Sequence, residues 1–552
     1  MIRKISTGII FLIMVSILLV PTKAMAHSYL VKSNPSQNEV LSETPQTISL
    51  QFSEAIQSSF HTINLVNSKG EKIKLEKTNV SKKNPSILEA QLDSDLEKST
   101  YTVQWKVLSA DGHSISGTIP FSIRTNIDNT SLMEAKSNSD TPKGDMIGLR
   151  FLLYISFALY IGVIIFHLFL YDKSLHAAHN DIYSKSSNFI WLSLIGMAIS
   201  LILNLPLQTT LNADVSWTEI FTSSYLVDTI YKTTYGDIWI LQIFLLIILV
   251  ISTYLAIRKK FHSPIKHWII PLLTFVGLLL TKAMSGHANS TNPKFIPVLM
   301  DLLHLSASSI WIGVLLVFVL LLPRKITNEN KELYWNSINR FSLWATICIS
   351  VIVVTGVYSS LLYVPTIYSL FHTLYGKLLI GKIGLFVIML LLGAFHFVKG
   401  KKRGAIELKF SILIELVVGL FVVIMVGILT NSATALSSPG PFTQSKVMEN
   451  GYEVSLQISP NIEGENSFDV TIVDEEGKKV ENVEQMSLTF RHLDMTMGEN
   501  TIVLKQIATG KFQTKGLYAN MAGNWNVTVH VLTKSLDSFD INFRPLVGSQ
   551  KN

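Results

Sequence analysis

Val298–Leu322 reads VLMDLLHLSASSIWIGVLLVFVLLL and decides the fold of the central part of the chain. It is about as long as the roughly 20 residues that a helix needs to cross a bilayer. Seven further apolar runs lie near Ile147–Tyr171, Phe189–Leu207, Ile238–Ile257, Trp268–Met284, Phe341–Tyr363, Leu378–Val398 and Phe410–Leu429. In lipid only helices satisfy their own backbone groups over such runs, so we predict an eight-helix transmembrane bundle over residues 146–431.

The composition agrees with a membrane protein that carries soluble parts. Of the 552 residues, 15% are charged, against roughly 25% in soluble domains, and 48% are hydrophobic. This excludes a disordered chain and argues against an ordinary cytosolic enzyme. The single cysteine, Cys348, excludes a disulfide or a cysteine-based metal site within one chain. A metal would have to bind His, Asp, Glu, Met or the backbone.

Basic residues lie mainly in alternate loops between the apolar runs. The first, third, fifth and seventh loops carry Lys173, Lys185, Arg258, Lys259, Lys260, Lys266, Arg324, Lys325, Lys331, Lys399, Lys401, Lys402, Arg403 and Lys409. Positive charge resists translocation, so these loops are predicted to be cytoplasmic. The net charge of +7 therefore needs no nucleic-acid partner.

Residues 1–26 have the pattern of a secretion signal. Arg3 and Lys4 precede the apolar stretch Gly8–Val20, and Ala24-Met-Ala26 supplies a small-x-small cleavage pattern. Cleavage after Ala26 would make His27 the first residue and place it outside the cell. Eight crossings would then return the C-terminus to the outside as well. The alternative is an uncleaved anchor helix.

The two regions that flank the bundle alternate between polar and apolar residues with a period of two, which indicates β-strands. Residues 27–125 are predicted to form an antiparallel β-sandwich or barrel, followed by a polar linker over 126–145. Residues 432–447, which contain Pro439-Gly-Pro441, are predicted as a second linker. Residues 448–552 are predicted to form a second small β-domain on the outer face.

His27 is the first candidate for metal chemistry. At a mature N-terminus, its α-amine and imidazole can chelate one ion, and Asp111-Gly-His113 adds a carboxylate and a second imidazole. Two imidazoles, an amine and a carboxylate suit tetragonal Cu(II). An ordinary turn is the alternative interpretation of Asp-Gly-His.

The first β-region resembles the copper-binding CopC family. The resemblance lies in His27-SYLVKSN-Pro35, Leu50-QFS-Glu54 and Trp105-KVLSADGHSISGTIP-Phe121. It implies a Cu(II) site at His27, Asp111 and His113.

The bundle resembles CopD in Ser285-GH-Ala288, Asp301-LL-His304 with Trp311-I-Gly313, Thr355-GV-Tyr358 and Tyr375-GKL-Leu379. The last region resembles YtkA-like domains in Arg491-HLDMT-Met497 and Asn524-Trp525. The three-part order resembles YcnJ-like copper import proteins.

Ionisable residues at membrane depth usually face an interior path. In the predicted topology His287, Asp301 and His304 gather near the outer face, and we predict a site there that receives copper from the outer domain. The alternative is a set of interfacial residues that contact water or a partner such as Lys282 or Lys382.

Two further groups of residues are weaker candidates. His167, His396 and Glu415 lie toward the cytoplasm as exit-side groups, or as polar residues near helix ends. In the C-terminal β-domain, His492, Met495 and Met497 could hold soft Cu(I), with Met486 and Met521 assisting. The alternative there is a strand with buried methionines and one surface histidine.

We therefore predict a copper uptake protein of the cytoplasmic membrane, not an enzyme, which captures copper outside and passes it inward. The chain has no G-x-x-x-x-G-K-[ST] motif, which disfavours pumping driven by ATP. An extracytoplasmic copper chaperone or a reductase is a candidate partner. The alternatives are a copper sensor, buffer or resistance protein without transport, an oxidative copper enzyme, and a haem protein using His167 with His396. The direction of flow, the oxidation state that crosses and the driving force stay open.

Overall fold

A computed structural model describes residues 30–36, 39–52, 55–76, 78–93, 95–109, 114–125, 144–171, 179–213, 215–221, 224–258, 265–286, 295–322, 331–400, 405–448, 451–493, 499–519 and 521–549. The predicted signal segment and most of the first predicted linker lie outside these ranges. Within them the predicted fold class is confirmed: a β-domain, an apolar helical part and a second β-domain follow one another along the chain.

The N-terminal domain is a sandwich of two sheets, with strand orders β1-β3-β7-β6 and β2-β9-β8-β4-β5. The strands are β1 Leu30–Asn34, β2 Glu39–Leu41, β3 Thr47–Phe52, β4 Ile56–Asn67, β5 Lys72–Ile73, β6 Asn79–Val80, β7 Ile87–Gln91, β8 Ser99–Ser109 and β9 Ser114–Ile123. Alternate residues Ile48, Leu50 and Phe52 are buried between the sheets, as the period of two predicts. Phe52 meets Trp105 of the other sheet edge to face, with ring centroids 5.3 Å apart.

The central part consists of helices that run alternately in opposite directions. They are α2 Gly144–Ile165 with the π-helical turn η1 Phe166–Leu170, α3 His179–Ala213, η3 Glu219–Phe221, α4 Tyr225–Lys232, α5 Thr234–Arg258, η4 Ile265–His267, α6 Ile269–Met284, α7 Phe295–Leu321, α8 Lys331–Tyr363, α9 Ile367–His372, α10 Leu374–Gly400, α11 Ala405–Leu429 and η6 Ala435–Ser437. Helices α2 and α7 cross closely: a Cβ added to Gly162 would lie 2.3 Å from the carbonyl carbon of Gly313.

Seven helices in the described residues are long and apolar enough to cross a membrane. The remaining predicted span corresponds to α6, which has 16 residues. At about 1.5 Å per residue it is shorter than the roughly 30 Å hydrocarbon layer. It begins after the turn η4 and ends at Met284, and it packs against α5 and α7. The bundle therefore contains the eight predicted apolar segments, one of them short.

The C-terminal domain is a second pair of sheets, with orders β10-β11-β12-β16-β15 and β14-β13-β17-β18, and with β19 beside β17. The strands are β10 Phe442–Val447, β11 Glu453–Ser459, β12 Gly464–Val473, β13 Val483–His492, β14 Asn500–Val503, β15 Lys505–Ala508, β16 Lys511–Ala519, β17 Gly523–Thr533, β18 Ser538–Phe543 and β19 Leu546–Val547. The structure differs from the predicted linker 432–447, whose last six residues form the edge strand β10. That strand is exposed at five of its six positions, so its sequence lacks the apolar alternation of an inner strand.

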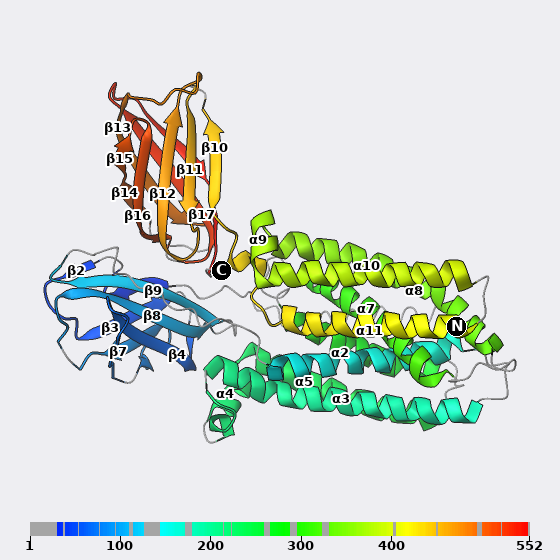
Figure 1. Cartoon of the computed structure of the whole chain (residues 1–552). Helices are drawn as coiled ribbons and strands as arrows, with labels where there is room; N and C mark the ends of the chain where they lie inside the picture. The colour runs from blue at the N-terminus through cyan, green and yellow to red at the C-terminus, as the bar shows by residue number, and fades with distance from the viewer. Residues whose placement is uncertain are drawn as a thin grey trace.

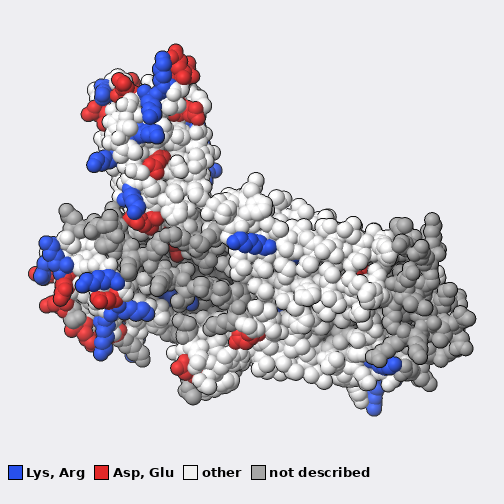
Figure 2. Space-filling view, viewed as in Figure 1, with Lys and Arg blue, Asp and Glu red and all other residues white. Residues whose placement is uncertain are grey.

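Both β-domains lie at the same end of the helical bundle (Figure 1). We call this the β-domain end; α2, α7 and α10 begin there, and α8 and α11 end there. On the face seen in Figure 2, charged side chains cover the two β-domains, while the helical part is almost uncharged. This distribution is that of a multi-pass membrane protein with polar attachments.

Candidate copper sites

The predicted N-terminal ligands His27, Asp111 and His113 lie outside the described residues, but the strands that flank them are described. Leu30 begins β1 and pairs with Phe52 at the end of β3. Ser109 ends β8 and pairs with Ile56 at the start of β4, shortly after β3 in the chain. The chain segments on either side of the predicted ligands therefore meet at one end of the sandwich.

This end of the sandwich contacts the membrane part. The side-chain amide of Gln57 in β4 donates a hydrogen bond to the carbonyl oxygen of Lys232 at the end of α4. The ring of Phe60 in β4 lies against that of Tyr225 at the start of α4, with centroids 6.1 Å apart. The fold thus seats the end of the domain where β1 begins and β8 ends on the β-domain end of the bundle.

In the bundle, Asp301 and His304 lie on α7 as predicted, while His287 lies outside the described residues. The Nδ1 atom of His304 is 2.8 Å from the hydroxyl oxygen of Thr355 on α8. That hydroxyl donates to the carbonyl oxygen of Val351 at 2.6 Å, so it accepts the proton from Nδ1. The lone pair of His304 is then on Nε2, where the ammonium group of Lys382 on α10 lies 3.4 Å away.

Cations surround the one carboxylate of this site. Asp301 interacts electrostatically with Lys382 and with Lys282 of α6; Lys282 is buried and Lys382 is half-buried. Arg150 of α2 lies close enough to Lys282 for the two charges to interact, and it donates to the carbonyl oxygen of Thr430 at 2.9 Å. Both lysines were expected only under the interfacial alternative, and the structure places them beside Asp301 and His304. A copper ion would have to displace the Lys382 ammonium from His304.

Further inward, two polar groups are buried among the helices. The indole nitrogen of Trp311, seven residues after His304 on α7, donates to the Glu415 carboxylate of α11 at 3.2 Å. Near the opposite end, His167 in the π-helical turn η1 bonds through Nε2 to the hydroxyl of Ser186 at 2.7 Å. Its ring stacks on that of Tyr183 at 5.2 Å. The side chain of His396 lies outside the described part, so the predicted pair with His167 is not tested.

In the C-terminal domain, His492 ends β13 and is buried. Its Nε2 atom lies 3.2 Å from the carbonyl oxygen of Ala522, and its ring meets that of Trp525 edge to face at 4.9 Å. The alternative interpretation of His492 as a surface histidine is therefore wrong, because β17 and the residues before it cover the ring. Met495 and Met497 lie outside the described residues.

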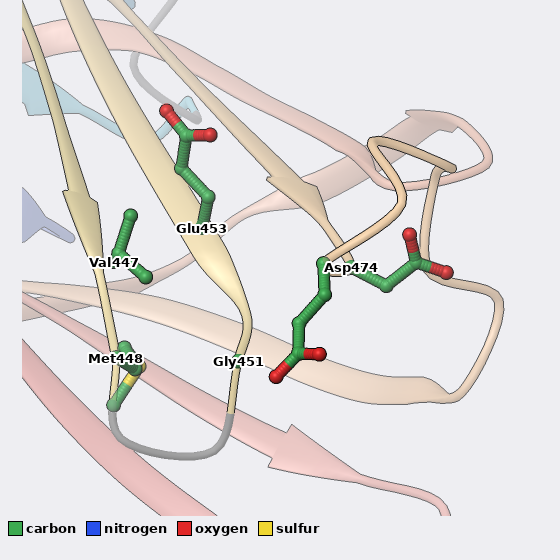
Figure 3. A pocket seen from close by; sticks show the side chains of 6 residues that line it. Val447, Met448, Gly451, Glu453 and Asp474 are labelled. Atoms are coloured by element: carbon green, nitrogen blue, oxygen red, sulfur yellow. The ribbon is translucent and has the colours of Figure 1, made fainter.

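A hollow of about 370 Å³ opens at the other end of this domain. It is lined by Val447, Met448, Gly451, Glu453, Asp474 and Glu475 (Figure 3). The Asp474 carboxylate accepts the backbone N–H groups of Glu476 and Lys478 at 3.0 and 2.8 Å, which closes the turn after β12. None of the predicted ligands lines this hollow.

The described residues alone do not complete a metal site. No group of three His, Cys, Asp or Glu side chains among them is arranged to hold an ion. Each of the three predicted ligand sets has at least one member outside the described ranges. The structure adds Thr355, whose hydroxyl oxygen lies 2.8 Å from Nδ1 of His304 and orients the ring.

The matches to known families follow the same three-part order. Residues 30–124 match the CopC domain, 144–294 the N-terminal domain of copper resistance protein D-like proteins, 336–429 copper resistance protein D, and 446–530 the YtkA-like family. These matches confirm the resemblance of the three parts to the CopC, CopD and YtkA-like families.

Whole proteins are similar as well. The copper transport protein CutJ of Bacillus subtilis (strain 168) is 36% identical over 96% of this chain and 98% of its own. Copper resistance protein C of Xanthomonas campestris pv. juglandis is 33% identical over 22% of this chain and 97% of its own. Copper resistance protein D of Pseudomonas syringae pv. tomato is 26% identical over 44% of this chain and 78% of its own.

Proposed function

The chain belongs to the family of the copper transport protein CutJ, and from this premise we propose that it imports copper across the cytoplasmic membrane. The N-terminal domain captures Cu(II) outside the cell through the His27 amine and imidazole, Asp111 and His113. The bundle then passes copper inward. The two β-domains face the outside, and no enzymatic step is assigned to the protein.

The observation that carries this proposal is the contact between the sandwich and α4. The strands next to the predicted ligands converge at the end that docks through Gln57 and Phe60. A captured ion would therefore be held beside the membrane part and not at the far tip of the domain. A short distance of transfer raises the effective concentration of copper at the bundle.

The position of basic residues supports the orientation. Arg258 ends α5 and Lys331 begins α8, both at the end of the bundle opposite the β-domains. Lys185 lies near the start of α3, at the same end. An excess of positive charge marks the cytoplasmic side of a membrane protein.

Within the bundle, we propose that His287, Asp301 and His304 receive copper once Lys382 has moved from the His304 lone pair. Glu415 and then His167 lie further inward and are candidates for later steps. In the C-terminal domain, His492 with Met495 and Met497 is proposed to hold Cu(I) before or after the crossing. An extracytoplasmic reductase would supply that oxidation state.

The capture step is tested by Cu(II) titration of the mature full-length protein in nanodiscs, followed by electron paramagnetic resonance. We expect His27→Ala to abolish the tight Cu(II) signal and to lower radiocopper uptake into vesicles. The matched control is His530→Ala, which removes an exposed histidine paired with Asp540 at 2.7 Å in the C-terminal domain. Unchanged binding in His27→Ala, or a mature chain that begins at another residue, would overturn the capture mechanism.

A further inference from the structure

The helical bundle is built from two similar halves. Helices α2 to α6 form the first half and α7 to α11 form the second. Each half has a helix that begins at the β-domain end, a helix that returns, a short helix, and a further pair that runs away and back. The short helices α4 and α9 are each followed by a Thr-x-Tyr-Gly motif, which reads Thr233-TY-Gly236 in the first half and Thr373-LY-Gly376 in the second.

The joint that this motif forms has the same geometry in both halves. The hydroxyl of Thr233 donates to a carbonyl oxygen of α4 at 2.6 Å and accepts the backbone N–H of Gly236 at 3.0 Å. The hydroxyl of Thr373 donates to a carbonyl oxygen of α9 at 2.6 Å and accepts the N–H of Gly376 at 2.9 Å. A Cβ added to either glycine would lie 2.2 or 2.1 Å from a carbonyl oxygen of the short helix. Sequence and structure therefore repeat together.

The two halves are related by an approximate two-fold axis at the crossing of α2 and α7. Ile161-Gly-Val163 of α2 corresponds to Ile312-Gly-Val314 of α7. A Cβ added to Gly162 would lie 2.3 Å from the carbonyl carbon of Gly313, and one added to Gly313 would lie 3.0 Å from the Cα of Gly162. Such a reciprocal contact is typical of a two-fold interface. The last helix of each half packs against the first helix of the other, because α6 contacts α7 and α11 contacts α2.

This symmetry gives the proposed receiving site a counterpart in the first half. Arg150 and Asp301 each stand twelve residues before the glycine of their helix. Arg150 donates to the carbonyl oxygen of Thr430, directly after α11, at 2.9 Å. One carboxylate oxygen of Asp301 lies 3.9 Å from the place of a Cβ added to Gly286, shortly after α6. Each pocket is therefore formed by the first helix of one half and the end of the last helix of the other.

The tyrosines of the two joints follow the same correspondence. Tyr235, in the joint of the first half, interacts electrostatically with Arg150. Tyr375, in the joint of the second half, interacts electrostatically with Asp301. The two pockets thus have the same position in the fold and the same tyrosine beside them.

The pockets differ in the groups that could hold copper. Leu153 is the counterpart of His304, so an aliphatic side chain stands where the second pocket has an imidazole. Arg150 replaces the carboxylate of Asp301, and a guanidinium keeps its charge and has no lone pair to offer. The carbonyl end of a helix attracts a cation. At the end of α11 Arg150 supplies that cation, whereas Asp301 places a carboxylate at the end of α6.

The two β-domains are divided between the halves in the same way. The N-terminal domain contacts α4 of the first half, where Gln57 donates to the carbonyl oxygen of Lys232. In the second half the hydroxyl of Thr366, at the start of α9, donates at 2.6 Å to the carbonyl oxygen of Pro439, in the segment that leads to the C-terminal domain. The N-terminal domain is therefore docked on the half whose pocket contains Arg150.

We propose that Arg150 is a built-in cation that closes the counterpart pocket to copper, so that the bundle has one copper path, through the second half. A copper ion that approached this pocket would meet a like charge and no imidazole. The inference rests on the proposed function, because it takes Asp301 and His304 as the receiving site. It adds that copper released by the N-terminal domain has to pass to the other half of the bundle.

The test is anaerobic Cu(I) titration of the full-length protein in nanodiscs against the chelator bicinchoninate, in a His27→Ala/His492→Ala background. The additional pair Arg150→Asp/Leu153→His gives the first pocket the carboxylate and the imidazole of the second. We expect this variant to bind one more Cu(I) ion than the background protein. An unchanged number of bound ions in a variant that is monodisperse in size exclusion would overturn the proposal.

The matched control is Gly148→Asp/Phe151→His, which places the same two side chains with the same spacing two residues earlier on α2. A Cβ added to Gly148 meets nothing within 4 Å, so this pair lies outside the pocket. It is expected to gain no ion, and an equal gain in the control would contradict the proposal. A background protein that binds no copper in the bundle would defeat the receiving site itself, whereas one bound ion without a gain in the Arg150 variant would defeat this inference alone.

The reciprocal pair Asp301→Arg/His304→Leu guards against misfolding of the first variant. It gives the second pocket the residues of the first and should fold and bind no copper in the bundle. Combining both pairs should restore one bound ion, now in the first half. A reciprocal pair that does not fold, or a folded combination that binds no ion, would show that the pockets are not equivalent and would contradict the proposal.

Discussion

At the residue scale, His304 is held between two groups that define how it could bind copper. The Nδ1–H group of His304 donates a hydrogen bond to the hydroxyl of Thr355. The Nζ atom of Lys382 lies 3.4 Å from Nε2, which carries the lone pair. The imidazole is thus in the tautomer that a metal ligand needs, with an internal cation in the place of the metal. A hydrogen bond from a charged group contributes roughly 1.5–3 kcal/mol.

Replacing that cation should expose the ligand. We expect Lys382→Leu to raise the affinity of the bundle for Cu(I) by about tenfold, because the ion no longer competes with an ammonium group for Nε2. Lys377→Leu is the matched control, since Lys377 is exposed on the same helix. The measurement is chelator competition in the His27→Ala/His492→Ala background. An affinity that stays the same or falls would show that copper does not use the His304 lone pair.

A second prediction concerns Glu463 and the pH dependence of the stability of the C-terminal domain. Its pKa rises from the ordinary 4.5 to about 7 in the folded domain, mainly because it is buried. Between these two values the unfolded chain loses a proton that the folded domain keeps, so the stability of the domain falls as pH rises. The loss is at most about 3 kcal/mol, is absent below pH 4.5 and is complete above pH 7.

Hydrogen exchange of the strands β13 and β17 in the metal-free full-length protein measures this effect, once rates are corrected for the intrinsic pH dependence. Glu463→Gln should remove the decline between pH 5 and pH 7, whereas Glu465→Gln should retain it. A decline of equal size in the Glu463→Gln protein would assign the pH dependence to other groups.

Local spacing in the sequence carries information about where single residues lie on a helix. Asp301 and His304 are three apart on an apolar helix, and that spacing alone places them on one face. The contact between Lys382 and His304 was expected only as an alternative. It joins α7 to α10, and local spacing does not indicate contacts between helices that are distant in the sequence. No local sequence pattern indicated the environment of Glu463, because its hydrogen-bond partner, the backbone N–H of Ala522, is brought to it by the pairing of strands that are distant in the sequence.

At the element scale, the contact between α2 and α7 depends on two glycines. A Cβ added to Gly313 would lie 2.0 Å from the carbonyl oxygen of Ala158, and one added to Gly162 would meet the backbone of Gly313. Small residues let transmembrane helices approach closely. This approach fixes α7, and with it Asp301 and His304, against the rest of the bundle.

Gly313→Ala should therefore destabilise the bundle by about 1–3 kcal/mol, because the helices must move apart to admit a methyl group. The matched control is Gly148→Ala on α2, where an added Cβ meets nothing within 4 Å. Thermal unfolding of the purified protein in detergent, followed by fluorescence-detected size exclusion, measures the difference. Equal midpoints for the two variants would contradict the role given to this crossing.

The elements themselves were largely predictable. Long apolar runs predicted the helices and the period of two predicted the inner strands, because burial on one face or all round leaves a strong pattern. Helix α6 matches the predicted run Trp268–Met284 to within one residue. The edge strand β10 departed from expectation, because it is mostly exposed and so has no apolar alternation.

At the scale of the whole molecule, the two β-domains share one end of the bundle (Figure 1). The order of the three parts followed from the sequence, and so did the alternation of helix direction. The position of each domain on the bundle did not follow from the sequence, because the contacts involve few residues from each side. They are Gln57 and Phe60 on one domain and Pro439 on the other. Such small interfaces leave no periodic signal in a sequence.

The contact of Phe60 with Tyr225 offers a way to separate capture from transfer. Tyr225→Ala removes the ring that Phe60 lies against, without touching the residues predicted to bind Cu(II). We expect Cu(II) affinity to stay unchanged and radiocopper uptake into vesicles to fall several-fold, because the loaded domain is no longer held at the bundle.

Tyr231→Ala is the matched control, since Tyr231 lies on the same helix with 76% of its surface exposed. A loss of uptake confined to Tyr225→Ala would tie transport to the docked position of the sandwich. If both variants take up copper as the wild-type chain does, the contact with α4 serves only to anchor the domain. If Tyr225→Ala also weakens Cu(II) binding, the docked helix forms part of the capture site itself, and the two steps are not separable at this interface.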